Sequence, residues 1–200
     1  MHAYIDDVLV ITKNNVQDHL KSLDRFLQRL TEVGLKVNTE KAFFGLTETE
    51  YLSLWVINDR VRPLSYKLED IKAIDVPTNV RNIWKFLRLV NYYRYMWRKR
   101  AHTLATLTNL CSTKVQFKYT DVENNAFIAM KKIVGHNVLL SYPNFIKRFI
   151  IHTDARKMQH WGVISQNGKT IAFYSRKLTP AQINYTTIES ELLNIVENLK

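Results

Sequence analysis

The sequence is poor in cysteine, glycine and proline, and it has no long hydrophobic run. Its 200 residues include one cysteine (Cys111), five glycines and four prolines. One cysteine excludes an internal disulfide framework and a cysteine-based zinc site, and it fits a reducing, intracellular location, cytoplasmic or nuclear. No apolar run approaches the roughly 20 residues of a spanning helix, and the N-terminus lacks a basic start. We therefore expect neither a transmembrane segment nor a signal peptide.

Negative charge is also scarce. Lysine and arginine number 29 against 18 aspartates and glutamates, which gives a formal net charge of +11. A chain this basic predicts a polyanionic partner, with nucleic acid ahead of a membrane surface. The hydrophobic fraction of 46% excludes wholesale disorder, and the length allows one or two domains.

The positive charge is concentrated in the middle of the chain. No aspartate or glutamate occurs between Val76 and Thr120, and aromatic residues are interleaved with the bases there. The nine basic residues of this stretch are Arg81, Lys85, Arg88, Arg94, Arg98, Lys99, Arg100, Lys114 and Lys118. Bases and aromatics together suit a phosphate backbone and stacked bases. The alternative is an amphipathic helix with a solvated basic face.

Helical periodicity assigns the two kinds of residue to different faces of a helix over 80–100. Ile83, Phe86, Leu87, Val90, Tyr93 and Trp97 share one face, and Arg81, Lys85, Arg88 and Lys99 share the opposite one. We therefore expect the aromatic residues of the first face in the core and the basic face free for phosphates. The bases at 98–100 would suit the negative end of the helix dipole.

Local signals predict the remaining elements. A hairpin is expected over 4–12, then a helix capped by Asn15 that ends at Gly34. Its inward-facing residues should be Val16, Leu20, Leu23, Leu27 and Leu30. Capping boxes at Thr120 and Thr186 should begin two later helices. Strands are expected at 35–38, 42–44, 50–57, 149–153, 162–166 and 170–174, and helices at 68–74, 122–134 and 186–199. The last two strands should be joined by a turn at Asn167-Gly168.

Two adjacent acids interrupt the first apolar stretch, at Asp6 and Asp7. Neighbouring residues of a strand point to opposite faces, so both carboxylates can reach one site only if the backbone turns there. A hairpin tip with two carboxylates would need one more oxygen ligand to form a magnesium site. The alternative is a solvated turn, because aspartate is a common turn residue.

The context of these acids resembles a known family. Tyr4-Ile5-Asp6-Asp7, followed by Val8-Leu9-Val10-Ile11, resembles the Tyr-x-Asp-Asp box of reverse transcriptases. Further motifs follow in the family's order: Leu30-Thr31-Glu32-Val33-Gly34-Leu35, Lys41-Ala42-Phe43-Phe44, Glu50-Tyr51-Leu52, Phe86-Leu87 with Asn91-Tyr92-Tyr93-Arg94, and Ala172-Phe173-Tyr174-Ser175-Arg176-Lys177-Leu178. Together they resemble the Pol polyprotein of a gypsy-class LTR retrotransposon, from the middle of the polymerase palm into ribonuclease H.

The resemblance implies an α+β fold in three parts. Residues 1–62 would be the end of a truncated palm, and residues 63–116 a basic helical thumb that grips the primer–template duplex. Residues 117–200 would be the first part of a ribonuclease H-like α/β domain. The implied partner is an RNA–DNA hybrid or a DNA or RNA duplex, with no membrane role. The implied chemistry is RNA-directed DNA synthesis and hybrid hydrolysis with Mg²⁺.

The resemblance also assigns site residues. Asp6 and Asp7 would bind magnesium with a third aspartate, which in the family lies upstream of where this chain begins. Asp154, in Thr153-Asp154-Ala155, would be the first metal ligand of ribonuclease H, and Glu191 the second. Glu189 competes with Glu191, but Thr186 explains it as a capping residue. Two further family carboxylates would lie beyond Lys200.

Five positions depart from the small residues of the family pattern. They are Ser53, Arg60 (with Asp59), Arg88, Arg156 and Trp161. A tryptophan in place of glycine in a core strand predicts overpacking by roughly 1–3 kcal/mol, and Arg156 adds a cation two residues from Asp154. We therefore expect a decayed copy that is inactive on its own. The alternatives are a non-catalytic nucleic-acid-binding remnant that kept the basic thumb, and a structural protein with no nucleic-acid role.

Overall fold

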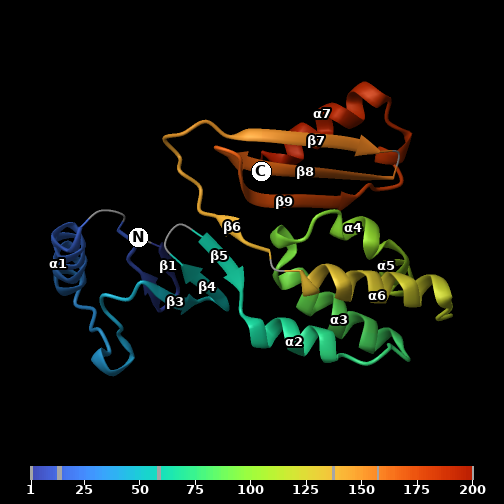
Figure 1. Cartoon of the computed structure of the whole chain (residues 1–200). Coiled ribbons are helices and arrows are strands. Elements are labelled where there is room, and N and C mark those ends of the chain that lie inside the picture. The colour runs from blue at the N-terminus through green and yellow to red at the C-terminus, as the bar shows by residue number, and fades with distance from the viewer. Residues whose placement is uncertain (1, 13–14, 58–59, 137, 157, 200) are drawn as a thin grey trace. The chain divides into compact units, whose positions relative to one another are not determined.

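The structure is a computed structural model that describes residues 2–12, 15–57, 60–136, 138–156 and 158–199. The chain folds into two compact units, Met1–Arg60 and Val61–Lys200, which are treated separately below (Figure 1). None of the helices in the described ranges is long and apolar enough to cross a membrane. The three-part division at 62/63 and 116/117 stays a prediction.

The first unit begins with the expected hairpin. Strands β1 (His2–Tyr4) and β2 (Asp7–Leu9) pair antiparallel, and Tyr4 is opposite Asp7. Helix α1 (Val16–Glu32) follows. Asn15 caps it by accepting a hydrogen bond from the backbone N–H of Asp18 at 2.8 Å. The chain leaves the helix through Gly34, whose φ of +73° is the left-handed conformation predicted there.

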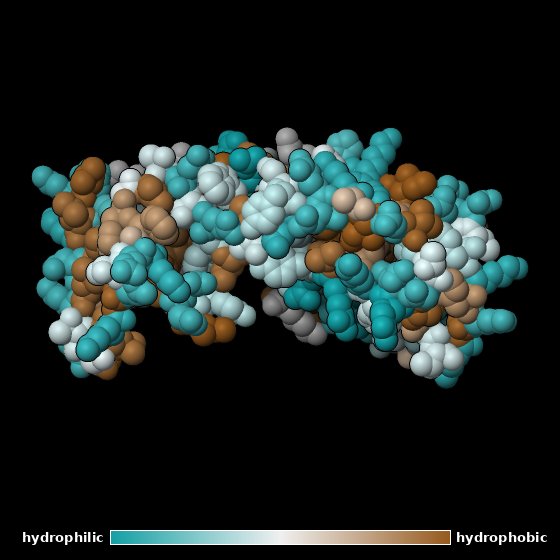
Figure 2. Space-filling view, turned by 90° about the horizontal axis from the view of Figure 1, so that it is seen from below, coloured by the Kyte–Doolittle hydropathy of each residue, from teal (hydrophilic) through white to brown (hydrophobic). Residues whose placement is uncertain are grey.

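The apolar face of α1 is not buried, which corrects the prediction that it faces inward. No residue of the helix is buried, and the side chains of Val16 and Leu20 are 73% and 56% exposed. Phe43 and Phe44 on the following segment are exposed as well. Figure 2 shows hydrophobic residues on the surface of this unit. The pattern predicted the helix correctly, but its apolar side is at most half-buried, as at Leu23, Phe26 and Leu30.

The remaining strands of the first unit differ from the prediction. A single strand was expected over 50–57, but the segment is a hairpin of β3 (Glu48–Tyr51) and β4 (Leu54–Ile57). Leu52 and Ser53 form its turn with φ of +48° and +58°, the left-handed values that a two-residue turn requires. The strands predicted at 35–38 and 42–44 are absent; this region has only the 3₁₀ turn η1 (Thr39–Lys41), because no neighbouring strand pairs with those segments. Asp59 lies outside the described residues.

The second unit begins with a group of helices. Strand β5 (Arg60–Pro63), at the junction of the two units, is adjacent to β6 (Leu140–Ser141). The helices are α2 (Ser65–Ala73), α3 (Val80–Tyr92), the 3₁₀ turn η2 (Arg94–Met96), α4 (Arg100–Thr103), α5 (Ala105–Leu110) and α6 (Asp121–Gly135). Thr120 and Glu123 form the predicted capping box of α6. Phe127 on α6 packs against Phe86 on α3 with ring centroids 4.6 Å apart, at the centre of the core.

The long helix predicted over 80–100 is shorter, although its buried face is confirmed. Ile83, Phe86, Leu87, Val90, Tyr93 and Trp97 are all buried. However, α3 ends at Tyr92, and the Trp97 indole donates a hydrogen bond to the Val90 carbonyl at 3.2 Å. Lys99 then has a φ of +52° before α4. The bases at 98–100 are therefore not at the end of α3, and the predicted dipole interaction is wrong for them.

The rest of the second unit is a three-stranded antiparallel sheet and one helix. Strands β7 (Ile150–Arg156), β8 (Gln159–Gln166) and β9 (Lys169–Lys177) pair in that order, and Asn167-Gly168 forms the predicted turn. A 3₁₀ turn, η3 (Gln182–Asn184), precedes α7 (Thr187–Asn198), which begins at the predicted Thr186–Glu189 capping box. Helix α7 covers one face of the sheet, and the α4 segment packs against the other (Figure 1).

Candidate metal and nucleic-acid sites

The first acidic pair lies at the tip of the β1–β2 hairpin. Ile5 and Asp6 form the turn, and Asp7 begins β2. Ile5 has a φ of +52°, which is uncommon for a β-branched residue and costs on the order of 1–3 kcal/mol. The side chains of Asp6 and Asp7 are both exposed. The backbone therefore turns at the acidic pair, as a site shared by both carboxylates would need. Both carboxylates are accessible to a ligand.

Tyr51 on β3 lies against this turn. Its hydroxyl donates a hydrogen bond to the backbone carbonyl of Asp7 at 3.5 Å. Burial, and then the negative charge of Asp7, raise the pKa of Tyr51 above its ordinary value. Two adjacent, exposed carboxylates suit a hard cation such as Mg²⁺. Among the described residues, however, no group of three or more acidic, histidine or cysteine side chains is arranged to hold a metal.

The basic face of α3 is exposed as predicted. Arg81, Lys85 and Arg88 lie one turn apart along the helix, and all three are exposed while the opposite face is buried. Arg94 is also exposed; its guanidinium lies over the ring of Tyr95, 4.6 Å from the centroid. Arg81, Lys85 and Arg88 form a row of positive charge on α3, and Arg94 adds a further exposed base just after the helix. No acidic residue occurs in this stretch of sequence.

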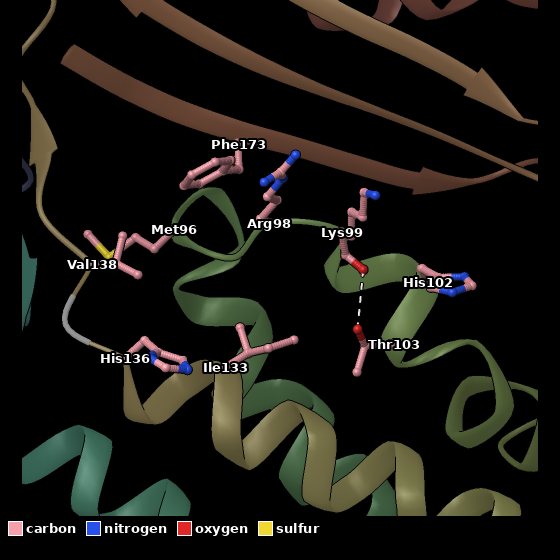
Figure 3. Close-up of a pocket in the computed structure, with 9 residues that line it drawn as sticks. All are labelled: Met96, Arg98, Lys99, His102, Thr103, Ile133, His136, Val138 and Phe173. Atoms are coloured by element: carbon pink, nitrogen blue, oxygen red, sulfur yellow. Dashed lines mark hydrogen bonds between the residues drawn. The ribbon is translucent and has the colours of Figure 1, made fainter. Parts of the chain in front are cut away.

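The bases at 98–100 make contacts within the second unit. Arg98 and Lys99 lie over the indole of Trp161, 5.1 and 4.9 Å from the ring. Figure 3 shows both side chains extending toward the sheet. Together with Phe173 they line a cavity of about 500 Å³. Arg100 is half-buried. It donates hydrogen bonds to Asn91 and to the Ser175 carbonyl, and burial lowers its pKa.

Asp154 on β7 is held by neighbouring side chains. The Trp161 indole N–H donates a hydrogen bond to its Oδ2 at 2.7 Å, and Arg156 Nε lies 3.2 Å from the same oxygen. These interactions, the Trp161 hydrogen bond foremost, lower the pKa of Asp154 below its ordinary value. Asp154 is also the single acidic residue between Glu123 and Glu189. Both contacts use Oδ2, so a metal ion bound through that oxygen would compete with a hydrogen bond and an ion pair.

Glu191 lies on α7, which packs against the face of the sheet opposite to Asp154. His160 contacts α7 through a 2.9 Å hydrogen bond between its Nε2 and Ser190 Oγ, and Arg176 pairs with Glu197 at 2.8 Å. Side chains alternate along a strand, so Trp161 and its partner Asp154 lie on the opposite face from His160. Glu191 is exposed on α7, and Glu189 forms the capping box as expected. The described contacts therefore do not bring Asp154 and Glu191 together.

The expected overpacking at Trp161 is not found. Its side chain is only partly buried, and Arg98 and Lys99 cover the ring. The tight position is its neighbour Gly162, where an added Cβ would lie 2.1 Å from the side-chain oxygen of Asn198. The sequence gives no local sign of this contact, because it depends on how α7 docks. Tyr51 was also missed as a neighbour of the acidic turn, since β3 and the turn are 44 residues apart.

Comparison with known proteins shows matches at both ends of the chain. Residues 1–56 match the family described as reverse transcriptase (RNA-dependent DNA polymerase), and residues 119–200 match the RNase H-like domain found in reverse transcriptase. The Pol polyproteins of the Drosophila melanogaster transposons 297 and gypsy are both 31% identical to the chain. They cover 97% and 98% of it, which is 18% and 20% of their own lengths. A Tf2-3 polyprotein from Schizosaccharomyces pombe is 26% identical over 99% of the chain.

The fold is also similar to that of a solved enzyme. A foamy viral protease-reverse transcriptase, solved in complex with an RNA/DNA hybrid, superposes with a TM-score of 0.79 at 19% identity. It covers 94% of this chain and 26% of its own. The chain belongs to the Pol polyproteins of LTR retrotransposons, with a reverse transcriptase segment followed by an RNase H-like segment. It spans about a fifth of the length of the Drosophila relatives.

Proposed function

We propose that the chain binds an RNA–DNA hybrid, or a DNA or RNA duplex, through the basic face of α3. The observation that carries the proposal is the exposed row of Arg81, Lys85 and Arg88, with Arg94 beyond it. A row of cations on one rigid helix suits the regular spacing of backbone phosphates. The foamy viral enzyme of the same fold, bound to a hybrid, supports this choice of ligand.

For the reverse transcriptase segment we propose Asp6 and Asp7 as magnesium ligands. The strained turn presents both carboxylates to solvent, and strain of this kind gathers at functional sites. When bound, magnesium would supply activation of a hydroxyl nucleophile and stabilisation of a leaving group. The part contributed by this chain is two exposed oxygen ligands on a fixed hairpin. Since no third ligand joins them among the described residues, we expect no polymerase activity from this chain.

For the RNase H-like segment we propose a structural role without hybrid cleavage. The resemblance assigns Asp154 and Glu191 as metal ligands, yet Asp154 is engaged by Trp161 and Arg156. Two-metal hydrolysis needs carboxylates that converge on both ions. The contacts around Asp154 instead join the sheet to the segment that carries Arg98 and Lys99. This favours the nucleic-acid-binding remnant over an active nuclease.

Filter binding of a blunt RNA–DNA hybrid at several salt concentrations tests the proposal. If Arg81, Lys85, Arg88 and Arg94 each neutralise a phosphate, the plot of log K against log salt should have a slope of about −3 to −4. The slope should become less steep by about 3 in a triple variant with Arg81→Gln, Lys85→Gln and Arg88→Gln. The matched control is Lys21→Gln, Arg25→Gln and Arg29→Gln, three exposed bases at similar spacing on α1. The assignment to α3 would be refuted if both triple variants flattened the salt slope equally. It would also be refuted if the wild-type chain did not bind the hybrid.

A further inference from the structure

The segment between β6 and β7 presents an apolar tip to solvent. It runs from Pro143 to Phe149 and lies beyond the end of the three-stranded sheet (Figure 1). Phe145 at its tip is 83% exposed, and Ile146 is 97% exposed. Contiguous exposed apolar side chains of this size on a loop often mark a contact surface.

The loop is fixed in place by one buried side chain. Gln166 at the end of β8 is 6% exposed, and its amide nitrogen donates hydrogen bonds to the carbonyls of Asn144 and Lys147 at 2.8 and 3.0 Å. Its amide oxygen accepts from the Asn144 N–H at 2.9 Å. The Asn144 side chain in turn accepts from the Ile146 N–H at 3.1 Å. The tip therefore projects from a hydrogen-bonded turn, which lowers the ordering cost of binding.

The charge around the tip indicates the nature of the partner. Lys147 and Arg148 follow Ile146 directly, and both are exposed. No aspartate or glutamate occurs between Glu123 and Asp154. The ring of Phe149 lies 5.9 Å from that of Phe145 and supports it from one side. An aromatic ring held beside two cations fits a ligand that has both a π-face and negative charge, which describes an unpaired nucleotide.

We propose that residues 143–149 form a second nucleic-acid contact, in which an unpaired base of a single-stranded tail stacks on Phe145. Ile146 packs against the next base, and Lys147 and Arg148 neutralise the phosphates beside it. A paired base already stacks on its neighbours within a duplex, so the exposed ring selects single strands. This inference rests on the proposed binding of nucleic acid, but it uses a different surface from α3.

The test compares a blunt RNA–DNA hybrid with the same hybrid carrying a five-nucleotide single-stranded tail. The tail should increase affinity about fivefold or more, because stacking on one aromatic side chain contributes roughly 1–3 kcal/mol per base. Phe145→Ala should abolish this gain and leave blunt-hybrid binding unchanged, whereas Phe145→Trp should keep the gain. The matched control is Phe43→Ala, which removes an aromatic ring that is 76% exposed in the first unit. Because Phe145 is exposed, the alanine variant should melt as the wild type does.

Two further arms separate this proposal from its alternatives. Lys147→Gln with Arg148→Gln should flatten the salt slope of the tailed substrate by about 1.4 and leave the blunt slope unchanged. A single-stranded oligonucleotide alone should bind in a Phe145-dependent way even if blunt-hybrid binding fails, so failure of the α3 site is distinguished from failure of this one. The proposal is overturned if Phe145→Ala keeps the tail gain. The proposal is also overturned if Phe145→Ala abolishes binding to phosphatidylserine vesicles and leaves nucleic-acid binding unchanged, because the loop would then contact a membrane surface.

Discussion

The indole N–H of Trp161 donates a 2.7 Å hydrogen bond to the carboxylate of Asp154, and Arg98 and Lys99 lie over the same indole ring. Asp154 is the residue for which family resemblance predicts a metal ion, and Trp161 stands where that pattern has a glycine. The substitution gives the carboxylate a protein partner. The same ring joins the sheet to the segment before α4, so it links a change at the expected metal ligand to the packing of the second unit.

Removing these partners should free Asp154 for a metal ion. In a variant with Arg156→Ser and Trp161→Gly, we expect Mn²⁺ binding to tighten by up to about fivefold, because an exposed cation repels the ion by about 1 kcal/mol or less. Paramagnetic broadening of the NMR signals of residues 153–155 measures this directly. Hybrid cleavage should stay undetectable, since the described contacts leave Glu191 apart from Asp154.

The matched control adds Asp154→Asn to the same variant and should return Mn²⁺ binding to its original level. Cleavage by the wild-type chain that disappears with Asp154→Asn alone would contradict both the prediction and the structural role proposed for Asp154.

The acidic turn should bind a divalent ion weakly. Mn²⁺ titrated into the wild-type chain should broaden the signals of residues 4–8, with an affinity no tighter than the millimolar range expected of a site with few ligands. Asp6→Asn with Asp7→Asn should abolish the effect. Asp18→Asn with Asp24→Asn removes one half-buried and one exposed aspartate from α1 and should not change it. Primer extension with magnesium by the purified chain would contradict the absence of polymerase activity.

Elements with strong local signals could be predicted from the sequence. Asn15 and Gly34 bound α1, the capping boxes at Thr120 and Thr186 begin α6 and α7, and Asn167-Gly168 forms its hairpin turn. In each case the signal and the structure it determines lie within a few residues of each other. The buried face of α3 was predicted for the same reason, because helical periodicity is a local property.

Features that depend on distant contacts could not be predicted. The end of α3 at Tyr92 depends on Trp97 folding back onto Val90, and no break residue marks it in the sequence. The turn at Leu52-Ser53 has no glycine to signal it. In the candidate site, a backbone turn at the acidic pair was predicted from adjacent residues, and the turn lies at Ile5-Asp6, directly before Asp7. The engagement of Asp154 by Trp161 was not predicted, because it depends on the register of β7 against β8.

The capping box of α6 should make stability depend on pH. Glu123 accepts hydrogen bonds from the Thr120 hydroxyl and backbone N–H, and these lower its pKa below the ordinary value of 4.5. A lowered pKa in the folded state stabilises the fold above the ordinary pKa, and this stabilisation is lost as pH falls through the folded value. Between pH 6 and pH 3.5, the melting temperature of Glu123→Gln should therefore fall less than that of the wild type.

The control for this prediction is Glu69→Gln, which removes an exposed carboxylate from the middle of α2 where it caps no helix. Its melting temperature should fall with pH as much as that of the wild type. Thr120→Ala should cost about 1 kcal/mol at pH 6, because it removes the other half of the box. An identical pH response in wild type and Glu123→Gln would show that the box contributes nothing measurable.

Gly162 should tolerate no side chain, because α7 docks directly over it. An alanine Cβ there would lie 2.1 Å from Asn198 Oδ1, and Asn198 cannot move freely since its amide nitrogen donates hydrogen bonds to Asn194. Gly162→Ala should therefore lower the free energy of unfolding by about 1–3 kcal/mol, measured by urea denaturation. The matched control is Gly135→Ala at the end of α6, where the nearest atom is the flexible Lys72 side chain at 3.4 Å and little change is expected.

A double variant tests the cause of that loss. If the clash with Asn198 is responsible, Gly162→Ala combined with Asn198→Ala should lose less stability than the sum of the two single variants, because the second substitution removes the atoms that the first one meets. A coupling of about 1 kcal/mol or more would place the cost at this contact. If the two losses of unfolding free energy simply add, the loss arises elsewhere in β8. That result would contradict the docking of α7 over Gly162.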